Sequence, residues 1–202
     1  MTRSCTILTF VLLTLLFSLT SQTEDNYIQD ACSVTRYRDI CIHTLASFSH
    51  TAKHSPSRWA RAGVSVTIGE AKKVSKYLRI HRSDTIVKGR NKVALLDCVA
   101  SFQDTLGNLH KSLGVLRKLN FREFDSQMGD VTTWLSAALT DEDTCLDGFD
   151  GRKGKVVESL LNRVSNVSYM TSNALALVNK LATTGPKSTA EGLILIIISF
   201  LA

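Results

Sequence analysis

Residues 95–116 read LLDCVASFQDTLGNLHKSLGVL, and this stretch decides the fold. Its apolar side chains recur at alternating steps of four and three residues, at Leu95, Val99, Phe102, Leu106, Leu109, Leu113 and Leu116. Steps of this size place all of these side chains on one face of an α-helix. A long, uninterrupted apolar seam of this kind is typical of a helix packed inside a bundle.

Three further segments carry seams with similar spacing. The first helix is predicted to begin at Ser55–Pro56, because a capping residue is followed there by a proline suited to the first helical position. The third is expected over about Asp125 to Leu146. The seam positions are Val64, Ile68, Ala71, Val74 and Leu78 in the first helix, Met128, Val131, Leu135 and Ala138 in the third, and Val157, Leu160, Val164, Val167, Thr171, Ala174, Val178 and Leu181 in the fourth. Together the four seams predict an all-α, up-down-up-down antiparallel four-helix bundle.

The two ends of the chain are expected to lie outside this bundle. Arg3 precedes a mostly apolar run that ends at Leu19, which is typical of a secretory signal peptide and too short for a membrane span. We therefore divide the chain into a signal peptide (1–22), an N-terminal helical hairpin (23–52), the bundle (53–184) and a C-terminal tail (185–202). The last ten residues, LILIIISFLA, are all apolar or small, and a lipid-anchor signal remains an alternative to a docked tail.

Cysteine usage agrees with export from the cell. The chain has five cysteines, and Cys5 would leave with the signal peptide, so four remain. Four cysteines in an oxidising compartment indicate two disulfides with three possible connectivities. Cys98 and Cys145 lie at nearly equal distances along the chain from the connector 120–122. An antiparallel pair of helices would bring these two residues together.

The remaining pair would then be Cys32–Cys41. A continuous helix of nine residues would separate the two by about 13.5 Å. A disulfide allows about 7 Å between Cα atoms at most. The chain must therefore bend between the two cysteines, and we expect the bend around Arg36–Asp39. The result is a short hairpin stapled by a disulfide ahead of the bundle.

No pattern in the sequence is typical of a catalytic, cofactor or metal site. Gly63–Thr67 lacks the last glycine of a nucleophile elbow. A calcium loop counted from Asp141 would need glycine where Leu146 stands. The cysteines have no CxxC spacing and no adjacent histidine pair, which disfavours zinc. We interpret the acids of 141–150 as a helix end and turn. The histidines are interpreted as separate surface residues, at His43, His50, His54, His81 and His110.

Two surface features have consequences outside the core. The formal net charge is +6, which favours binding to polyanions but is not dense enough to indicate nucleic acid. Asn166–Val167–Ser168 is an acceptable N-glycosylation sequon. Asn166 is offset from the seam positions Val164 and Val167, so we expect it to point outward and to accept a glycan.

Four motifs resemble those of the plant invertase and pectin methylesterase inhibitor family. Residues 130–149, DVTTWLSAALTDEDTCLDGF, closely resemble its TWLSAAL-T-x-x-D-T-C-x-x-G-F signature. CSVTRYRDIC at 32–41 is similar to the family's N-terminal paired-cysteine motif, with Arg38 where a proline is usual. ALLDC at 94–98 resembles the start of its second bundle helix, and 172–177 resembles its closing SNALAL run.

The resemblance implies a secreted helical inhibitor that acts in the plant cell wall or apoplast and catalyses nothing. It also implies the pairs Cys32–Cys41 and Cys98–Cys145, in agreement with the argument from spacing. The expected partner is pectin methylesterase, in a 1:1 complex that covers the substrate cleft. Electrostatic association with acidic pectin is a further expectation. No cofactor, metal or nucleic acid is expected.

Two related functions remain as alternatives. Invertase inhibitors of the family resemble one another in a Pro-Lys-Phe motif before the second bundle helix, whereas the matching stretch here is Gly89–Arg90–Asn91–Lys92. The missing motif favours pectin methylesterase as the target. A pro-region of a pectin methylesterase is the other alternative, although no basic processing site and no β-helix sequence follow the bundle in these 202 residues. A purely structural wall protein would affect neither enzyme.

Overall fold

The computed structural model describes residues 26–82 and 88–185, and in these residues it contains helices and turns but no strand. Four long helices form the main body: α4 (Pro56–Arg82), α5 (Arg90–Arg117), α6 (Phe124–Asp147) and α7 (Lys155–Thr184). The smaller N-terminal part holds a helix over 26–32, then α2 (Arg38–Leu45), the 3₁₀ turn η1 (Ala46–Phe48) and α3 (Ser49–Ala52). A second 3₁₀ turn, η2 (Phe121–Glu123), joins α5 to α6. The expected signal peptide, Cys5 and the apolar end of the tail lie outside the described residues.

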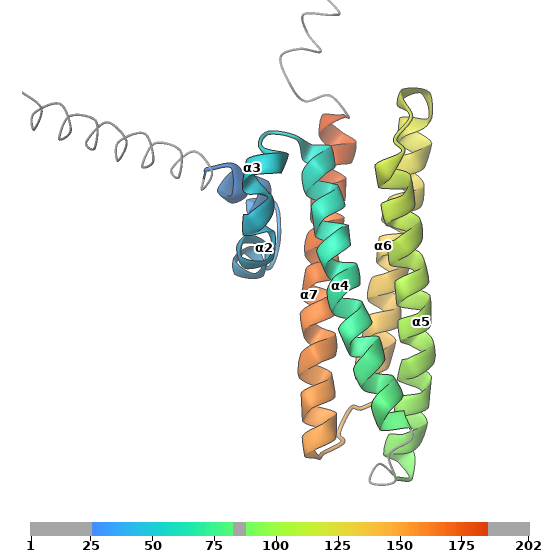
Figure 1. Ribbon diagram of the computed structural model, residues 1–202. Coiled ribbons are helices and arrows are strands. Elements are labelled where there is room, and N and C mark those ends of the chain that lie inside the picture. Colours follow the sequence, from blue (N-terminus) through green and yellow to red (C-terminus); the bar gives the residue numbers. More distant parts are fainter. Residues whose placement is uncertain (1–25, 83–87, 186–202) are drawn as a thin grey trace, which may run out of the picture.

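The long helices form an antiparallel four-helix bundle in which each helix packs on its neighbours in the chain (Figure 1). The ring is closed by contact between α4 and α7, so α4 and α6 lie diagonally opposite each other. Short connections force successive helices to run in opposite directions. The predicted fold class is confirmed.

The core of the bundle is built from the predicted seams. All the seam residues of α4, α6 and α7 are buried, and in α5 only Leu106 is partly exposed. Phe102, the largest side chain without exposed surface, lies about midway along α5. Each such apolar side chain stabilises the fold by about 1.5–3 kcal/mol through removal from water. The four-three spacing therefore identified the packed faces correctly.

Local residues set where the helices begin and end. α4 begins at Pro56 as predicted, and the Ser55 carbonyl accepts the first backbone bonds from Arg58 (3.1 Å) and Trp59 (3.2 Å). The Ser55 hydroxyl instead lies 3.2 Å from that of Ser57, so no side-chain cap forms there. Gly154 precedes α7 with φ +135°, a conformation that side chains disfavour.

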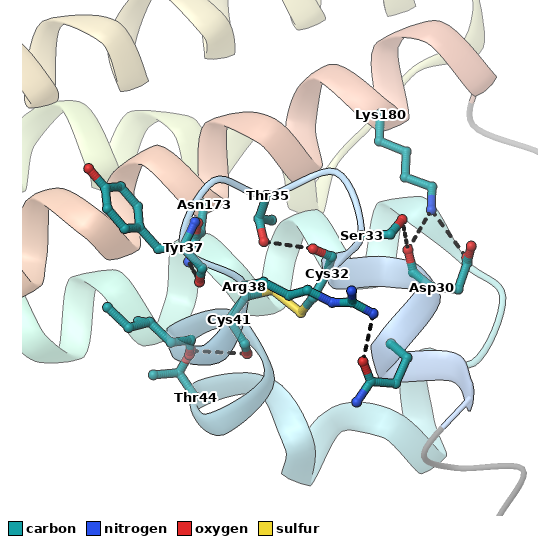
Figure 2. The surroundings of a disulfide bond; sticks show 12 residues. Asp30, Cys32, Ser33, Thr35, Tyr37, Arg38, Cys41, Thr44, Asn173 and Lys180 are labelled. Carbon is teal, nitrogen blue, oxygen red and sulfur yellow. Dashed lines mark hydrogen bonds and ion pairs between the residues drawn. A yellow bond between two sulfur atoms is a disulfide. The ribbon is translucent and has the colours of Figure 1, made fainter.

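The N-terminal hairpin bends where its disulfide requires. The helix over 26–32 ends at Cys32, and α2 begins at Arg38, so the bend occupies 33–37, slightly earlier than Arg36–Asp39. Cys32 and Cys41 form a disulfide with their Cα atoms 5.8 Å apart. Thr35 supports the bend because its hydroxyl donates to the Cys32 carbonyl at 2.7 Å (Figure 2).

The hairpin packs on the outside of the bundle, against α4 and α7 (Figure 1). Its own small core joins Ile28 and Leu45 to Trp59 of α4 and Leu177 of α7. Asn173 of α7 holds the bend directly. Its side-chain oxygen accepts from the Tyr37 backbone N–H at 3.1 Å, and its nitrogen donates to the Tyr37 carbonyl at 2.8 Å (Figure 2). The hairpin therefore covers the α4–α7 side, and within residues 26–82 and 88–185 no element covers the α5–α6 side.

Candidate functional site

Basic and acidic side chains are concentrated on different helices of the bundle. α4 carries seven lysine and arginine residues and a single acid, Glu70. α6 carries six acids and no lysine or arginine. Because these two helices lie diagonally opposite, the molecule has one basic side and one acidic side. The charge summed along each predicted helix reveals this separation, whereas the net charge of +6 does not.

The acids gather toward the C-terminal end of α6. Asp141, Asp143 and Asp147 lie within its last two turns, and no basic residue stands in the last turn. Negative charge is unfavourable at a helix C-terminus, and Asp143 and Asp147 stand in the repulsive i,i+4 relation. In the described part of the chain, none of these carboxylates forms a salt bridge; the two salt bridges found are Lys73–Glu70 and Lys180–Asp30. The cluster therefore opposes helix stability rather than supporting it.

Side chains of α5 extend this acidic face. The Asn108 amide donates to Asp141 across the two helices at 3.3 Å. Partial burial raises the pKa of Asp141, the nearby charge of Asp104 raises it further, and the bond from Asn108 acts in the opposite direction. We call these acids, Asp104 of α5 and Asp143 and Asp147 of α6 together with the Asn108–Asp141 pair, the acidic face; Asp104 and Asp141 lie at the α5–α6 contact, and Asp143 lies on the outer flank of α6.

A disulfide holds the two helices of the acidic face together. Cys98 of α5 and Cys145 of α6 are bonded, with Cα atoms 4.5 Å apart and almost no exposed surface. Cys145 lies between Asp143 and Asp147 in the chain. The disulfide therefore fixes the position of these two acids along the axis of α5. The structure pairs the four cysteines as the sequence analysis expected.

Exposed apolar side chains lie at both ends of α5. Val93 (59%) and Leu96 (45%) are exposed in the first turns of α5, and Phe121 (77%) is exposed in the turn between α5 and α6. A recognition surface commonly combines a few exposed apolar anchors with charged groups. The uncovered α5–α6 side is therefore the best candidate for a protein-binding surface.

Comparison with known proteins shows the family to which the chain belongs. The family model for the plant invertase/pectin methylesterase inhibitors matches residues 26–177, which include the hairpin and most of the bundle. The chain belongs to this family. The resemblance drawn from the sequence motifs is confirmed.

Two of the similar proteins in this family are inhibitors of pectinesterase or pectin methylesterase. Pectinesterase inhibitor 6 of Arabidopsis thaliana is 45% identical over 161 residues, which cover 79% of this chain and 77% of that protein. The crystal structure of mutant form A of a pectin methylesterase inhibitor from Arabidopsis superposes with a TM-score of 0.61 over 73% of this chain and 92% of that chain. At 23% identity this second likeness concerns the fold alone.

A segment of a larger protein is also similar. Pectinesterase 1 of Citrus sinensis is 32% identical over 162 residues, which cover 78% of this chain but only 28% of that protein. The inhibitor-family domain thus has a counterpart within an esterase chain.

Residues 89–92, which stand where invertase inhibitors of the family carry Pro-Lys-Phe, have a structural role in this protein. Gly89 stands before α5 with φ +58°, where glycine is favoured. The Lys92 ammonium donates to the Arg82 carbonyl in the last turn of α4. Asn91 accepts from Arg152 of the α6–α7 connection at 3.4 Å. The residues in place of Pro-Lys-Phe therefore tie together one end of the bundle.

The predicted glycosylation site lies in a less open position than expected. Asn166 is half-buried on α7, and its amide lies 3.8 Å from the Met170 sulfur. It lines a hollow of about 450 Å³ together with His43 of α2 and Glu70 of α4. Glycosylation of Asn166 stays a prediction.

Other predicted features can be placed briefly. His43, His50, His54 and His110 are exposed, while His81 is half-buried with its ring 4.3 Å from that of Tyr77. Within 26–82 and 88–185, no cluster of three or more potential ligands could hold a metal ion. The same residues include no helix long and apolar enough to cross a membrane. Leu135 is buried and Trp134 is half-buried beside it.

Proposed function

We propose that this protein is a secreted inhibitor of pectin methylesterase that forms a 1:1 complex and covers the substrate cleft of the enzyme. The observation that carries the proposal is the 45% identity to pectinesterase inhibitor 6 over 161 residues, which cover 79% of this chain. The missing Pro-Lys-Phe motif at Gly89–Lys92 favours the esterase over invertase as the target. The protein would act in the apoplast and cell wall, where its positive charge favours association with acidic pectin.

The acidic face is our candidate for the surface that meets the enzyme. The hairpin occupies the α4–α7 side, whereas among the described residues the α5–α6 side is uncovered and its carboxylates form no salt bridge. Carboxylates that oppose helix stability can be offset by a favourable contact in a complex. The esterase surface that contacts them would then be basic.

An inhibition titration tests the target. The mature protein, with both disulfides formed, is titrated into pectin methylesterase at mildly acidic pH, and demethylation is followed; invertase is assayed in parallel. We expect the esterase to lose activity up to an equimolar end point and invertase to be unaffected. Inhibition of invertase alone would make the invertase inhibitor the correct alternative, and inhibition of neither enzyme would refute both.

A matched pair of triple variants tests the surface. Asp104→Asn, Asp143→Asn and Asp147→Asn together remove exposed carboxylates of the acidic face. Asp39→Asn, Glu70→Gln and Glu158→Gln remove the same number from the opposite side. We expect the first set to weaken inhibition by about tenfold or more, because interfacial charge pairs contribute several kcal/mol, and the second by less than about threefold. Equal losses would assign the effect to net charge rather than to this face.

A pro-region within an esterase chain remains the second candidate, and the similarity to a segment of pectinesterase 1 favours it. A pro-region would assist folding of an esterase more than it inhibits the folded enzyme. Refolding yield of denatured esterase, measured with and without the protein, separates the two functions.

A further inference from the structure

A small pocket lies at the end of the bundle where α4 begins and α5 ends. α3 of the hairpin lines its third side, and the pocket, which is open to solvent, has a volume of about 270 Å³. This is slightly below the range of about 300–1,000 Å³ typical of pockets for drug-sized ligands, so it suits a small chemical group such as a single sugar unit. Its α5 residues, Leu113 and Arg117, lie in the last turns of this helix, and the pocket shares no residue with the acidic face.

Three arginines surround the pocket: Arg58 and Arg61 from the first turns of α4, and Arg117 from the last turn of α5. No acidic residue lines it. Within the described part of the chain, no carboxylate forms a salt bridge with any of the three. Three like charges around one hollow repel each other, and a bound anion would relieve that repulsion.

Two of the arginines are already held in place by the protein. Arg58 donates from Nη1 to the Thr51 carbonyl at the end of α3, and Arg61 donates from Nε to the Ser57 carbonyl at 3.3 Å. A guanidinium group has five N–H donors, so most of the donors of both remain available. Arginine donors in a fixed orientation match the two oxygens of a carboxylate.

The rest of the lining is partly apolar. Phe48 of η1 and Leu113 of α5 contribute hydrocarbon, and the Ser65 hydroxyl adds a further polar group. An inorganic anion would make no use of the apolar side chains. A uronic acid would use both parts, because it carries a carboxylate and hydroxyls on a ring with C–H faces.

The basic surface continues from the pocket along α4. Lys72, Lys76 and Arg79 follow Arg58 and Arg61 on the exposed side of this helix, at steps that keep them on one face. From Arg58 to Arg79 the helix rises about 30 Å. A polymer of uronic acids held in the pocket could therefore extend along the helix (Figure 1).

We propose that the Arg58–Arg61–Arg117 pocket is a binding site for a uronate unit of an acidic polysaccharide. This site would hold the protein on the polymer while the acidic face stays free for a protein partner. The proposal rests on the association with acidic pectin in the proposed function and gives it a site, but it does not depend on inhibition of the enzyme, because pocket and acidic face share no residue.

Binding of oligogalacturonate to the mature protein tests the proposal by titration calorimetry at low ionic strength. The variant set is Arg58→Gln, Arg61→Gln and Arg117→Gln. The control set is Lys72→Gln, Lys76→Gln and Arg79→Gln, which removes the same charge from the same basic surface outside the pocket. We expect the pocket variant to bind about tenfold more weakly or worse, and the control to lose no more than about fivefold. Circular dichroism verifies that both variants are folded.

Chemical specificity is tested with two further probes. Methyl-esterified oligogalacturonate, which lacks the carboxylate, should bind at least about tenfold more weakly than the acid form. Potassium sulfate should compete only through general screening, to the same extent as potassium chloride at equal ionic strength. Equal losses in the two variant sets, equal binding of the ester, or specific competition by sulfate would each overturn the proposal. No esterase is present in these titrations, so their outcome is independent of the inhibition assays.

Discussion

Glu142 is an acidic side chain of α6 with no exposed surface. The Thr171 hydroxyl of α7 donates to its Oε1 at 2.8 Å, while Oε2 has no hydrogen-bond partner. Burial raises the pKa of Glu142 to about 8, the charges of Asp143 and Asp141 raise it as well, and the bond from Thr171 opposes them. The carboxyl is therefore neutral in the folded protein at mildly acidic pH.

This protonation makes stability depend on pH. The ordinary pKa of the group is 4.5, and its folded value is about 8, so between these two pH values the folded chain keeps a proton that the unfolded chain releases. Stability is then fully present below pH 4.5 and falls as the pH rises toward 8. The size of this loss is on the order of a few kcal/mol.

Glu142→Gln tests this linkage. Glutamine keeps an oxygen for Thr171 but cannot ionise, so we expect urea unfolding between pH 5 and pH 8 to lose most of the downward slope of the wild type. Near pH 8 the variant should be more stable than the wild type, by an amount on the order of a few kcal/mol. Glu70→Gln, on the surface of α4, serves as the control and should keep the slope. Parallel curves for wild type and Glu142→Gln would contradict the assignment.

At the scale of elements, α4 and α7 pack closely at Gly63, a glycine of α4 that faces α7. A Cβ atom on Gly63 would stand 3.1 Å from Leu177 Cδ1 and 3.4 Å from Ala174 Cα, whereas one on Gly69, two turns later, would meet nothing within 4 Å. Ala174 and Leu177 belong to the SNALAL run. The small residues at 63 and 174 let the two backbones approach, and Leu177 fills the space beside the hairpin.

Substitution of the two glycines should have opposite effects. Gly63→Val forces the helices apart and should lower the free energy of unfolding by about 1–3 kcal/mol. Gly69→Ala adds helix propensity without a clash and should raise it by about 0.5–1 kcal/mol. Chemical denaturation of both variants under one set of conditions measures the difference. A stabilised Gly63→Val would show that the contact is looser than the distances indicate.

At the scale of the whole molecule, the two disulfides constrain different parts of the structure, the bundle and the N-terminal hairpin. Cys98–Cys145 spans 47 residues and joins α5 to α6 within the bundle, whereas Cys32–Cys41 spans 9 residues and closes the hairpin. A longer closed loop restricts the unfolded chain more. The bundle disulfide should therefore contribute more to global stability, although the hairpin disulfide is needed to hold its local bend.

Paired alanine variants measure this difference. Cys98→Ala with Cys145→Ala should lower the free energy of unfolding by about 4 kcal/mol, and Cys32→Ala with Cys41→Ala by about 3 kcal/mol. Urea unfolding followed by circular dichroism reports the bundle, and fluorescence of Trp59, which packs in the hairpin core, adds a local signal when it is measured in a Trp134→Phe background. A larger global loss from the hairpin pair would contradict the loop-length argument.

Much of this architecture was accessible from spacing alone. The seam from Leu95 to Leu116 predicts α5 and its buried face, because a helix repeats every 3.6 residues whatever surrounds it. The burial of Glu142 was missed, although the seam Met128, Val131, Leu135 and Ala138 continues at the same spacing to 142 and 145. The interpretation of these acids as a helix end and turn agrees with the end of α6 at Asp147, but it did not include the burial of Glu142, because charge was given more weight than periodicity.

The sequence by itself determined the helices, their buried faces and the family of the chain, since local periodicity and contiguous motifs carry that information. Three arrangements follow only from the tertiary structure: Asn173 holds Tyr37, Glu142 contacts Thr171, and Arg117 lines the same pocket as Arg58. Each of these contacts joins residues far apart in the chain or on different helices. Their geometry depends on which helices adjoin and at what height, and no local pattern in the sequence records it.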